Sequence, residues 1–305
     1  MAAYLAKRLL LALAVAVTVS VVNFSLVLLS GDIAVSIGGP TATYEQLAQI
    51  RRDLGLDQPI PIQYLRWLSE AVRGNFGDSL FYRIPVAELI AQRLPVTLTL
   101  GLCAMVFTVV VAIPLGVVAA LRPNSWIDRL ALSLAVAGQA MPSFWFALML
   151  IVLFSVLFPI LPPSGAESWE YFIMPTVVLG YSAVPAVMRL TRSGMIEVLA
   201  SDYVRTAYAK GLRHFKVLFK HGLRNAVIPV VSLAAVQFGY MLAGSIVVES
   251  IFALHGTGFL AWEAMKTADL PVVQAILFVF SIFYVVLTFL ADMLNAWLDP
   301  RIRIG

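Results

Sequence analysis

Six long apolar stretches constrain the fold of this chain more than any other feature of its sequence. A helix that spans a bilayer needs about 20 mostly apolar residues and satisfies its own backbone hydrogen bonds. Stretches of this kind occupy residues 9–29, 96–121, 130–158, 172–188, 226–248 and 272–291. We therefore predict an all-α integral membrane protein with six transmembrane helices.

The composition excludes the main alternatives. Of the 305 residues, 61% are hydrophobic and 12% are charged, whereas soluble proteins carry about 25% charged residues. So little charge cannot cover a soluble protein, and so apolar a chain does not stay disordered. The single cysteine, Cys103, cannot close an intramolecular disulfide. The first stretch is longer than the apolar core of a secretory signal and lacks a small-residue cleavage site, so we expect it to be retained as a span.

The basic residues predict the orientation in the membrane. With six spans, both termini lie on one side, and that side would hold 14 of the 21 Lys and Arg residues. Eight of these fall between Arg189 and Arg224, and two more, Arg301 and Arg303, fall in the tail. The positive-inside rule then puts both termini and the 189–224 region in the cytoplasm.

These spans divide the chain into four segments. Residues 1–30 hold the N-terminus and the first span, and residues 31–95 form an external helical segment. Residues 96–294 form a core of five spans with a cytoplasmic loop at 193–225, and residues 295–305 form a cytoplasmic tail. In the external segment, Thr43 and Gln46 have capping-box spacing and Gly55 is a helix stop, so they predict one helix; a second ends at Gly74.

The internal loop has the pattern of a docking element. A helix capped by Ser201 or Asp202 is expected to end at Gly211, and a basic helix follows. Ala207 and Gly211 are four residues apart, so we expect them to share a helical face with almost no side chain, which another surface could approach closely. A loop that only meets anionic lipid is an equal alternative on charge alone. The candidate docking residues are Asp202, Arg205, Thr206, Ala207, Lys210, Gly211, Arg213 and Lys216.

Charged residues avoid the centres of the predicted spans. Arg189, Glu249 and Asp292 fall near span ends, whereas proton-coupled carriers place ionisable groups inside the membrane. This pattern argues against a secondary transporter driven by an ion gradient and favours energy supplied by a partner. A membrane receptor or structural subunit without transport activity is a further alternative.

Milder polar residues do occur within the spans. They could line a passage for a polar solute or form hydrogen bonds between helices, which are common in membranes. Glu249, at the outer end of the fifth span, could meet a substrate amine or a binding protein at the external mouth, or form a structural salt bridge. The candidate pathway residues are Gln139, Ser143, Tyr181, Ser182, Gln237 and Tyr240.

The sequence lacks the motifs of catalytic and cofactor sites. It has no G-x-x-x-x-G-K-[ST] phosphate loop and no H-E-x-x-H zinc motif. The three histidines, His214, His221 and His255, are expected on both sides of the membrane and cannot share a metal. We therefore predict no catalytic residue, no metal site and no cofactor bound by this chain.

Seven motifs, in order along nearly the whole chain, carry a resemblance to a known family. They are LGLDQP at 54–59, GNFGDS at 74–79, PVAELIAQRLPVTLTL at 85–100, SDYVRTAYAKGL at 201–212, HGLRNAVIPVV at 221–231, GSIVVESIFALHGTGFL at 244–260 and DLPVVQA at 269–275. With them, the chain resembles the permease subunits of bacterial ATP-binding-cassette (ABC) importers of the dipeptide, oligopeptide, glutathione and nickel group. The segment GAESWEYFIMP at 165–175 is more similar to the glutathione branch.

The resemblance implies a type I importer permease fold whose cytoplasmic loop carries a coupling helix, the EAA motif, that docks on an ATPase. The matching positions are Arg205, Thr206, Ala207 and Gly211. Arg205 replaces the usual Glu, and Arg224 stands where the family usually has a Pro. Contacts expected of that Glu therefore do not carry over to this chain.

The resemblance also implies partners, a location and a substrate class. The implied partners are two ATP-binding subunits that hold ATP and Mg, a second homologous permease that completes a heterodimeric channel, a periplasmic solute-binding protein and the lipid bilayer, with no nucleic acid. The implied location is the bacterial inner membrane. The implied activity is import of di- or oligopeptides or glutathione-like peptides, with nickel or another small solute as the alternative.

Overall fold

The computed structural model describes residues 2–31, 33–39 and 42–298. Helices dominate these residues, and an isolated antiparallel bridge joins Asp78 to Pro85. The α-helices are α1 Ala2–Ser30, α2 Ile33–Gly38, α3 Tyr44–Leu54, α4 Ile60–Val72, α5 Val86–Leu121, α6 Trp126–Ala140, α7 Ser143–Ile151, α8 Ile173–Gly180, α9 Val184–Leu199, α10 Asp202–Ala209, α11 His214–Lys216, α12 Arg224–Ala226, α13 Ile228–Phe252, α14 Thr257–Lys266 and α15 Leu270–Leu298.

The predicted all-α membrane fold is confirmed. Within the described residues, five helical stretches are long and apolar enough to cross a bilayer: α1, α5, the run Trp169–Leu199 that contains α8 and α9, α13, and α15. A sixth candidate consists of α6 and the stretch Ser143–Leu157, which together pass the same test but are bent by 97°. The described residues therefore contain up to six spans.

The third predicted span, residues 130–158, is not one continuous helix. Pro142 immediately precedes α7, and α6 ends at Ala140. A proline has no backbone N–H, and it disfavours helical backbone in the residue before it. Met141 accordingly has extended backbone, and the chain turns at this point. The span is therefore bent here, and the apolar content of the sequence alone does not predict the bend.

Other boundaries also differ from the predicted ones. The second span begins before residue 96, because α5 starts at Val86. The fourth span continues beyond residue 188, because α9 extends to Leu199. The last helix reaches Leu298, so residues 295–298 of the predicted tail are helical. Arg301 and Arg303, which we assigned to the cytoplasmic side, lie outside the described residues.

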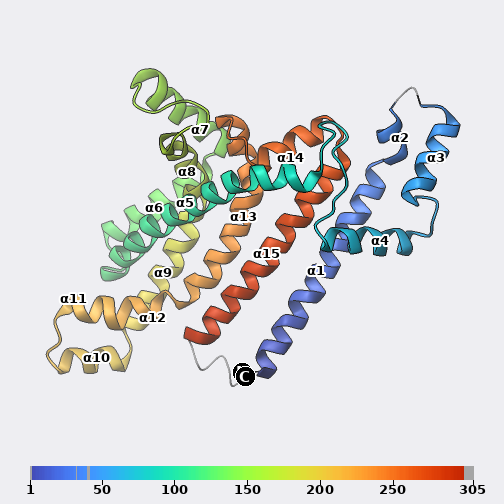
Figure 1. Cartoon of the computed structure of the whole chain (residues 1–305). Helices are drawn as coiled ribbons and strands as arrows, with labels where there is room; N and C mark the ends of the chain where they lie inside the picture. The colour runs from blue at the N-terminus through green and yellow to red at the C-terminus, as the bar shows by residue number, and fades with distance from the viewer. Residues whose placement is uncertain (1, 32, 40–41, 299–305) are drawn as a thin grey trace.

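The spans form an elongated bundle in which α15 lies between α13 and α1, and α5 crosses α13 and α15 (Figure 1). The start of α1, the end of α15 and the α10–α12 loop lie at one end of this bundle, whereas α2–α4, α7 and α14 lie towards the other. An ion pair between Arg8 and Asp292, at 2.8 Å, links α1 to α15. The first and last helices thus meet at the end that holds the basic loop.

Small residues allow α5 to cross α8 and α9 at close range. A Cβ on Gly180 would lie 2.7 Å from the carbonyl oxygen of Ala104, and one on Gly116 would lie 2.7 Å from that of Met188. Thr108 adds a hydrogen bond from its hydroxyl to the carbonyl of Gly180, at 2.9 Å. Close backbone approach through small residues is the usual means of helix association in membranes.

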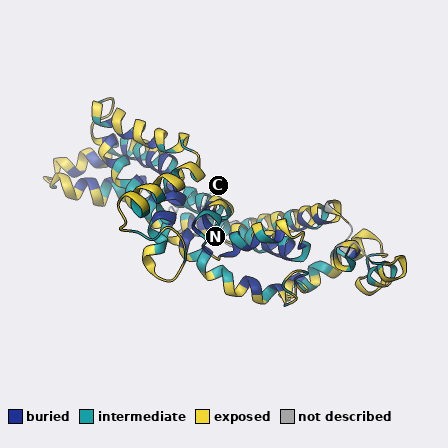
Figure 2. Ribbon diagram, turned by 90° about the horizontal axis from the view of Figure 1, so that it is seen from above, coloured by how far each residue is buried: buried dark blue, intermediate teal, exposed yellow. Residues whose placement is uncertain are grey.

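The outer faces of the helices remain apolar and exposed. Leu10 is 67% exposed and Val110 is 64% exposed. Figure 2 shows exposed residues along one side of most helices and buried residues along the side that faces the bundle. An exposed apolar surface of this extent fits a chain whose outer surface faces lipid rather than water.

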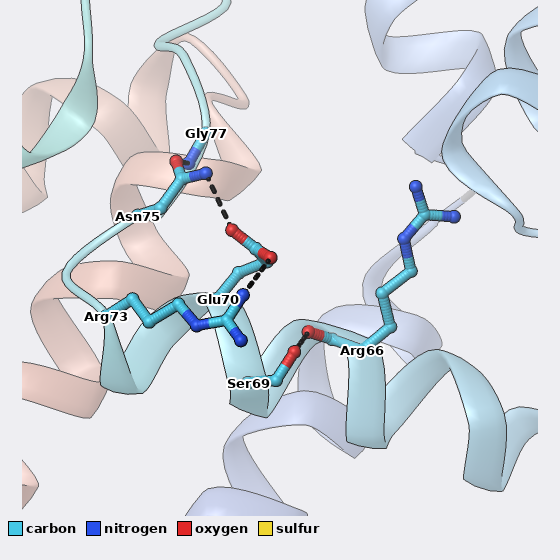
Figure 3. Close-up of polar contacts among 6 residues, drawn as sticks. All are labelled: Arg66, Ser69, Glu70, Arg73, Asn75 and Gly77. Carbon is cyan, nitrogen blue, oxygen red and sulfur yellow. Dashed lines mark hydrogen bonds and ion pairs between the residues drawn. The ribbon is translucent and has the colours of Figure 1, made fainter.

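The predicted external segment, residues 31–95, contains the two predicted helices among its described residues. Thr43 and Gln46 form the capping box of α3, and Gly55 ends that helix in a left-handed conformation. After α4, the Glu70 carboxylate accepts hydrogen bonds from Asn75 at 2.9 Å and Arg73 at 3.3 Å (Figure 3). These contacts fix the chain where α4 leads into the GNFGDS motif.

Asp269 brings two distant motifs together at this end of the bundle. Its carboxylate is 1% exposed and accepts a hydrogen bond from the Ser79 hydroxyl at 2.5 Å. It also accepts from the backbone N–H groups of Leu80 and Phe81, both at 3.2 Å. The GNFGDS and DLPVVQA segments therefore form one structural unit, which anchors the loop between α4 and α5 to the start of α15.

Candidate functional site

A pocket of about 290 Å³ opens between α6–α7, α8–α9 and α13. Its lining mixes apolar side chains with five polar ones, and for these we call it the polar pocket. Gln139 and Ser143 reach it from the α6–α7 bend, Ser182 from the start of the α9 region, and Gln237 and Tyr240 from α13. These are five of the six polar residues that the sequence singled out as pathway candidates. They come from three separate parts of the chain, so their convergence depends on the fold.

Tyr181, the sixth pathway candidate, does not line this pocket. Its hydroxyl donates a hydrogen bond of 2.5 Å to the carbonyl of Met141, and its ring centroid lies 4.7 Å from that of Phe146. Tyr181 thus braces the break between α6 and α7. The predicted pathway role of Tyr181 does not fit these contacts, because neighbouring residues on a helix point in different directions.

A second pocket of about 590 Å³ lies on the same three helices. On α6, Leu132 of this pocket and Gln139 of the polar pocket are seven residues apart, and on α13 Leu233 and Gln237 are four apart. Residues at these spacings share one helical face. The two pockets therefore follow one another along a single groove, which we call the α6–α9–α13 groove. The lining of the second pocket is Leu132, Ala186, Arg189, Leu190, Arg192, Ser193 and Leu233.

A buried ion pair joins α6 to α9 beside this second pocket. Arg192 donates two hydrogen bonds of 2.6 Å to Asp128, whose side chain is 2% exposed. The Asp128 carboxylate also accepts from the backbone N–H of Asn124 at 2.9 Å. A bidentate pair of this kind is among the stronger hydrogen-bonded contacts in proteins. Sequence reasoning missed it, because residues 64 positions apart give no local signal.

The basic loop folds into two short helices around Gly211. As predicted, α10 follows Ser201 and the chain breaks at Gly211, which has φ +74°. The Ser201 hydroxyl donates to the carbonyl of Val198 at 2.6 Å and makes no capping bond. The second helix is short and continues as a π-helical turn over Val217–Leu223.

The predicted small-residue face of the loop is wrong. The helix ends at Ala209, so Gly211 lies outside it and shares no helical face with Ala207. Ala207 is 6% exposed and packs with Val204 and Val217, inside the loop itself. Ala207 therefore stabilises the hairpin and is not available to a partner. Gly211 remains exposed, and nothing lies within 4 Å of the position of a Cβ.

The exposed surface of the loop is basic and aromatic. Arg205 forms an ion pair of 3.2 Å with Asp202, but both side chains are so exposed that the pair adds little stability. Phe215 is 71% exposed and packs on Phe219 at a centroid distance of 4.4 Å. Neither residue was among the predicted docking residues. The other predicted docking residues on this surface are exposed as well: Thr206, Lys210, Gly211, Arg213 and Lys216.

Glu249 does not reach an external mouth. Its side chain is 0% exposed, and its carboxylate accepts hydrogen bonds from the Thr97 hydroxyl at 2.7 Å and the Phe259 N–H at 2.8 Å. Thr97 in turn accepts from the Thr257 N–H at 2.8 Å. Glu249 thus caps the first turn of α14, where unpaired N–H groups favour a carboxylate. Both predicted roles, a contact with a substrate or binding protein and a salt bridge, are wrong.

Replacing Glu249 should therefore destabilise the protein. The Glu249→Ala change leaves the Thr97 hydroxyl and the Phe259 N–H without their acceptor, which costs about 1–3 kcal/mol for each buried unpaired group. Thermal unfolding of the purified chain in detergent should show a lower midpoint. The matched control is Glu88→Ala, because Glu88 is exposed and its side chain bonds only Gln92 on the helix surface. Equal midpoints for both variants would contradict the capping role.

Among the described residues, no group of three or more His, Cys, Asp and Glu side chains could hold a metal ion. The groove and the basic loop are the two features considered further. The groove holds two pockets along three helices. The basic loop is an exposed cationic surface at the end of the bundle where α1 begins.

Comparison with known proteins identifies relatives over nearly the whole chain. Residues 112–304 match the model of the family described as "Binding-protein-dependent transport system inner membrane component", and residues 1–101 match the model of its N-terminal region. The chain is 42% identical over 301 residues to the glutathione transport system permease protein GsiC of Salmonella paratyphi A, and equally to that of Escherichia coli K12. These alignments cover 98% of this chain and 98% of each relative.

A solved structure shares the fold. Inward-facing structures of the MetNI methionine ABC transporter match with a TM-score of 0.59 at 16% identity. The match covers 69% of this chain and 96% of the other. At this identity the likeness establishes the fold alone, and it agrees with the predicted type I importer permease architecture.

Proposed function

Since this chain belongs to the family of binding-protein-dependent transport system inner membrane components and is a permease subunit of an ABC importer, we propose that its solutes are peptides of the glutathione and oligopeptide class. The observation that carries this proposal is the polar pocket lined by Gln139, Ser143, Ser182, Gln237 and Tyr240. The amide and hydroxyl groups of these side chains can donate and accept hydrogen bonds, as the N–H and C=O groups of a peptide bond require.

The proposed importer contains further subunits. An ABC importer permease works with an ATPase and a solute-binding protein, and we propose two ATPase subunits, which hold ATP and Mg, and a second homologous permease. The sequence supports this division of labour, because this chain has no phosphate-binding loop. The α6–α9–α13 groove would form one half of the passage, and the second permease would cover its open side.

We place the chain in the bacterial inner membrane with both termini in the cytoplasm. The positive-inside rule supports this placement. So does Figure 1, in which the start of α1, the end of α15 and the basic loop lie at the same end of the bundle. The solute would then move from the periplasm, past α14 and the polar pocket, and leave beside the basic loop.

The 201–224 loop is the proposed contact with the ATPase. Its interior is packed by Val204, Ala207 and Val217, so the hairpin can move as a unit with α9 and α13. When the ATPase dimer closes on ATP, a rigid element seated on each subunit would transmit that motion to the spans as a rigid-body change. The cations Arg205, Lys210, Arg213 and Lys216 would pair with acidic residues around the contact.

Copurification tests the proposal. A tagged form of this chain, extracted from its native membranes in mild detergent, should recover an ATPase and a second permease. Recovery of neither, from membranes in which the chain is intact, would contradict the proposed assembly. An untagged strain gives the background.

A further inference from the structure

Arg189 is an unpaired cation in the α6–α9–α13 groove. Its side chain is exposed and lines the larger pocket together with Ser193 and Leu233. Within the described part of the chain, Arg189 has no ion pair or hydrogen-bond partner among the side chains. The neighbouring Arg192 differs, because Asp128 holds its guanidinium at 2.6 Å.

The groove offers no negative charge to Arg189. The described residues that line its two pockets include no Asp or Glu, and their charged members are Arg189 and Arg192. Since Asp128 compensates Arg192, one net positive charge faces the groove. A guanidinium is a strongly directional donor that matches a carboxylate with two parallel hydrogen bonds. The complement of this site is therefore an anionic, carboxylate-bearing solute rather than a metal cation.

The spacing along α9 matches the length of a short peptide. Ser182, Ala186, Arg189 and Ser193 follow one another at intervals of three and four residues and line the two pockets in turn. From Ser182 to Arg189 the helix rises about 10 Å. An extended di- or tripeptide spans about 7–11 Å. A peptide whose carboxylate lies at Arg189 can thus reach the amide and hydroxyl groups of the polar pocket.

We propose that Arg189 is a carboxylate-binding residue of the groove, which holds the C-terminal or another carboxylate of a short peptide during its passage. This inference rests on the proposed function, and it adds the charge of the solute and the residue that selects it. Arg189 is also well placed for release, because it lies on the part of the groove nearer to the basic loop. A solute that reaches it has already passed the polar pocket.

The test uses the whole importer, reconstituted in proteoliposomes with its second permease, its ATPase subunits and its binding protein. The probes are labelled glutathione and labelled dialanine, and the readout is the amount of solute taken up per ATP hydrolysed. Arg189→Gln should lower this ratio about tenfold, as expected for the loss of a charge-assisted hydrogen bond. Arg189→Lys keeps the positive charge but lacks the planar guanidinium. Its uptake per ATP should lie between that of the unmodified importer and that of Arg189→Gln.

Arg129→Gln is the matched control, because Arg129 is an exposed arginine near the start of α6 that does not line the groove. It should transport like the unmodified chain. The inference is overturned if Arg189→Gln transports at the unmodified ratio. It is also overturned if Arg189→Gln loses the second permease on copurification, because Arg189 then pairs with an acid of that subunit. If the unmodified importer moves neither probe, the proposed function fails and the inference fails with it.

Discussion

Gly211→Trp is expected to abolish ATP-driven uptake while the chain still inserts into the membrane. Gly211 lies at the exposed break of the basic loop, and nothing lies within 4 Å of the position of a Cβ. An indole at this point would project from the surface proposed to meet the ATPase and hold the two subunits apart. The left-handed backbone, at φ +74°, adds strain of about 1–2 kcal/mol, which is small against a stability of about 5–15 kcal/mol.

The measurement compares uptake, membrane content and ATPase copurification for this variant and for Gly74→Trp. Gly74 has a similar φ, +81°, and equally open space, but it lies between α4 and α5, outside the basic loop. Both variants therefore carry the same backbone strain and the same bulk. We expect Gly211→Trp to lose the ATPase and Gly74→Trp to retain it. Normal uptake by Gly211→Trp would show that the loop does not dock where we propose.

Ser182→Trp should block transport by a different route. Ser182 lines the polar pocket of about 290 Å³, and its hydroxyl makes only a local hydrogen bond, to the carbonyl of Leu179 at 3.2 Å. An indole there would fill much of the passage. Because the basic loop is untouched, the ATPase should still copurify and still hydrolyse ATP. Because the indole obstructs the solute and not the ATPase, we expect uptake per ATP to fall by at least about tenfold.

Thr18→Trp provides the matched control for this variant. Thr18 is also a small hydroxyl residue whose side chain bonds a backbone carbonyl, that of Ala14 at 2.8 Å, but it lies on the exposed face of α1. An added indole at Thr18 should meet lipid and leave uptake unchanged. Equal uptake by Ser182→Trp and Thr18→Trp would mean that the solute does not pass through the polar pocket.

The sequence predicted the features that depend on local pattern. Apolar length located the spans, and the spacing of Thr43, Gln46 and Gly55 located both ends of α3. The polar residues of the groove could be predicted because a polar side chain within an apolar span needs either a hydrogen-bond partner or contact with a polar solute. Five of them line one pocket.

Features that depend on tertiary contacts escaped prediction. Ala207 and Gly211 have helical spacing, but the helix ends before Gly211, so the shared face does not form. Glu249 lies at a span end, as expected of a surface charge, yet α14 folds back over it and buries it. Two arginines, Arg189 and Arg192, line the larger pocket. Only the structure shows that Asp128 pairs with Arg192 and not with Arg189. Sequence pattern gives no distance between such residues.

The central claim is that this chain forms part of a passage that ATP hydrolysis by partner subunits drives. Its most direct test is labelled-peptide uptake into proteoliposomes that contain the complete importer, with ATP supplied on the ATPase side, compared with proteoliposomes that contain this chain alone. We predict uptake that requires ATP and the ATPase subunits, and none by the chain alone under any ion gradient. Gradient-driven uptake by the chain alone would contradict the account.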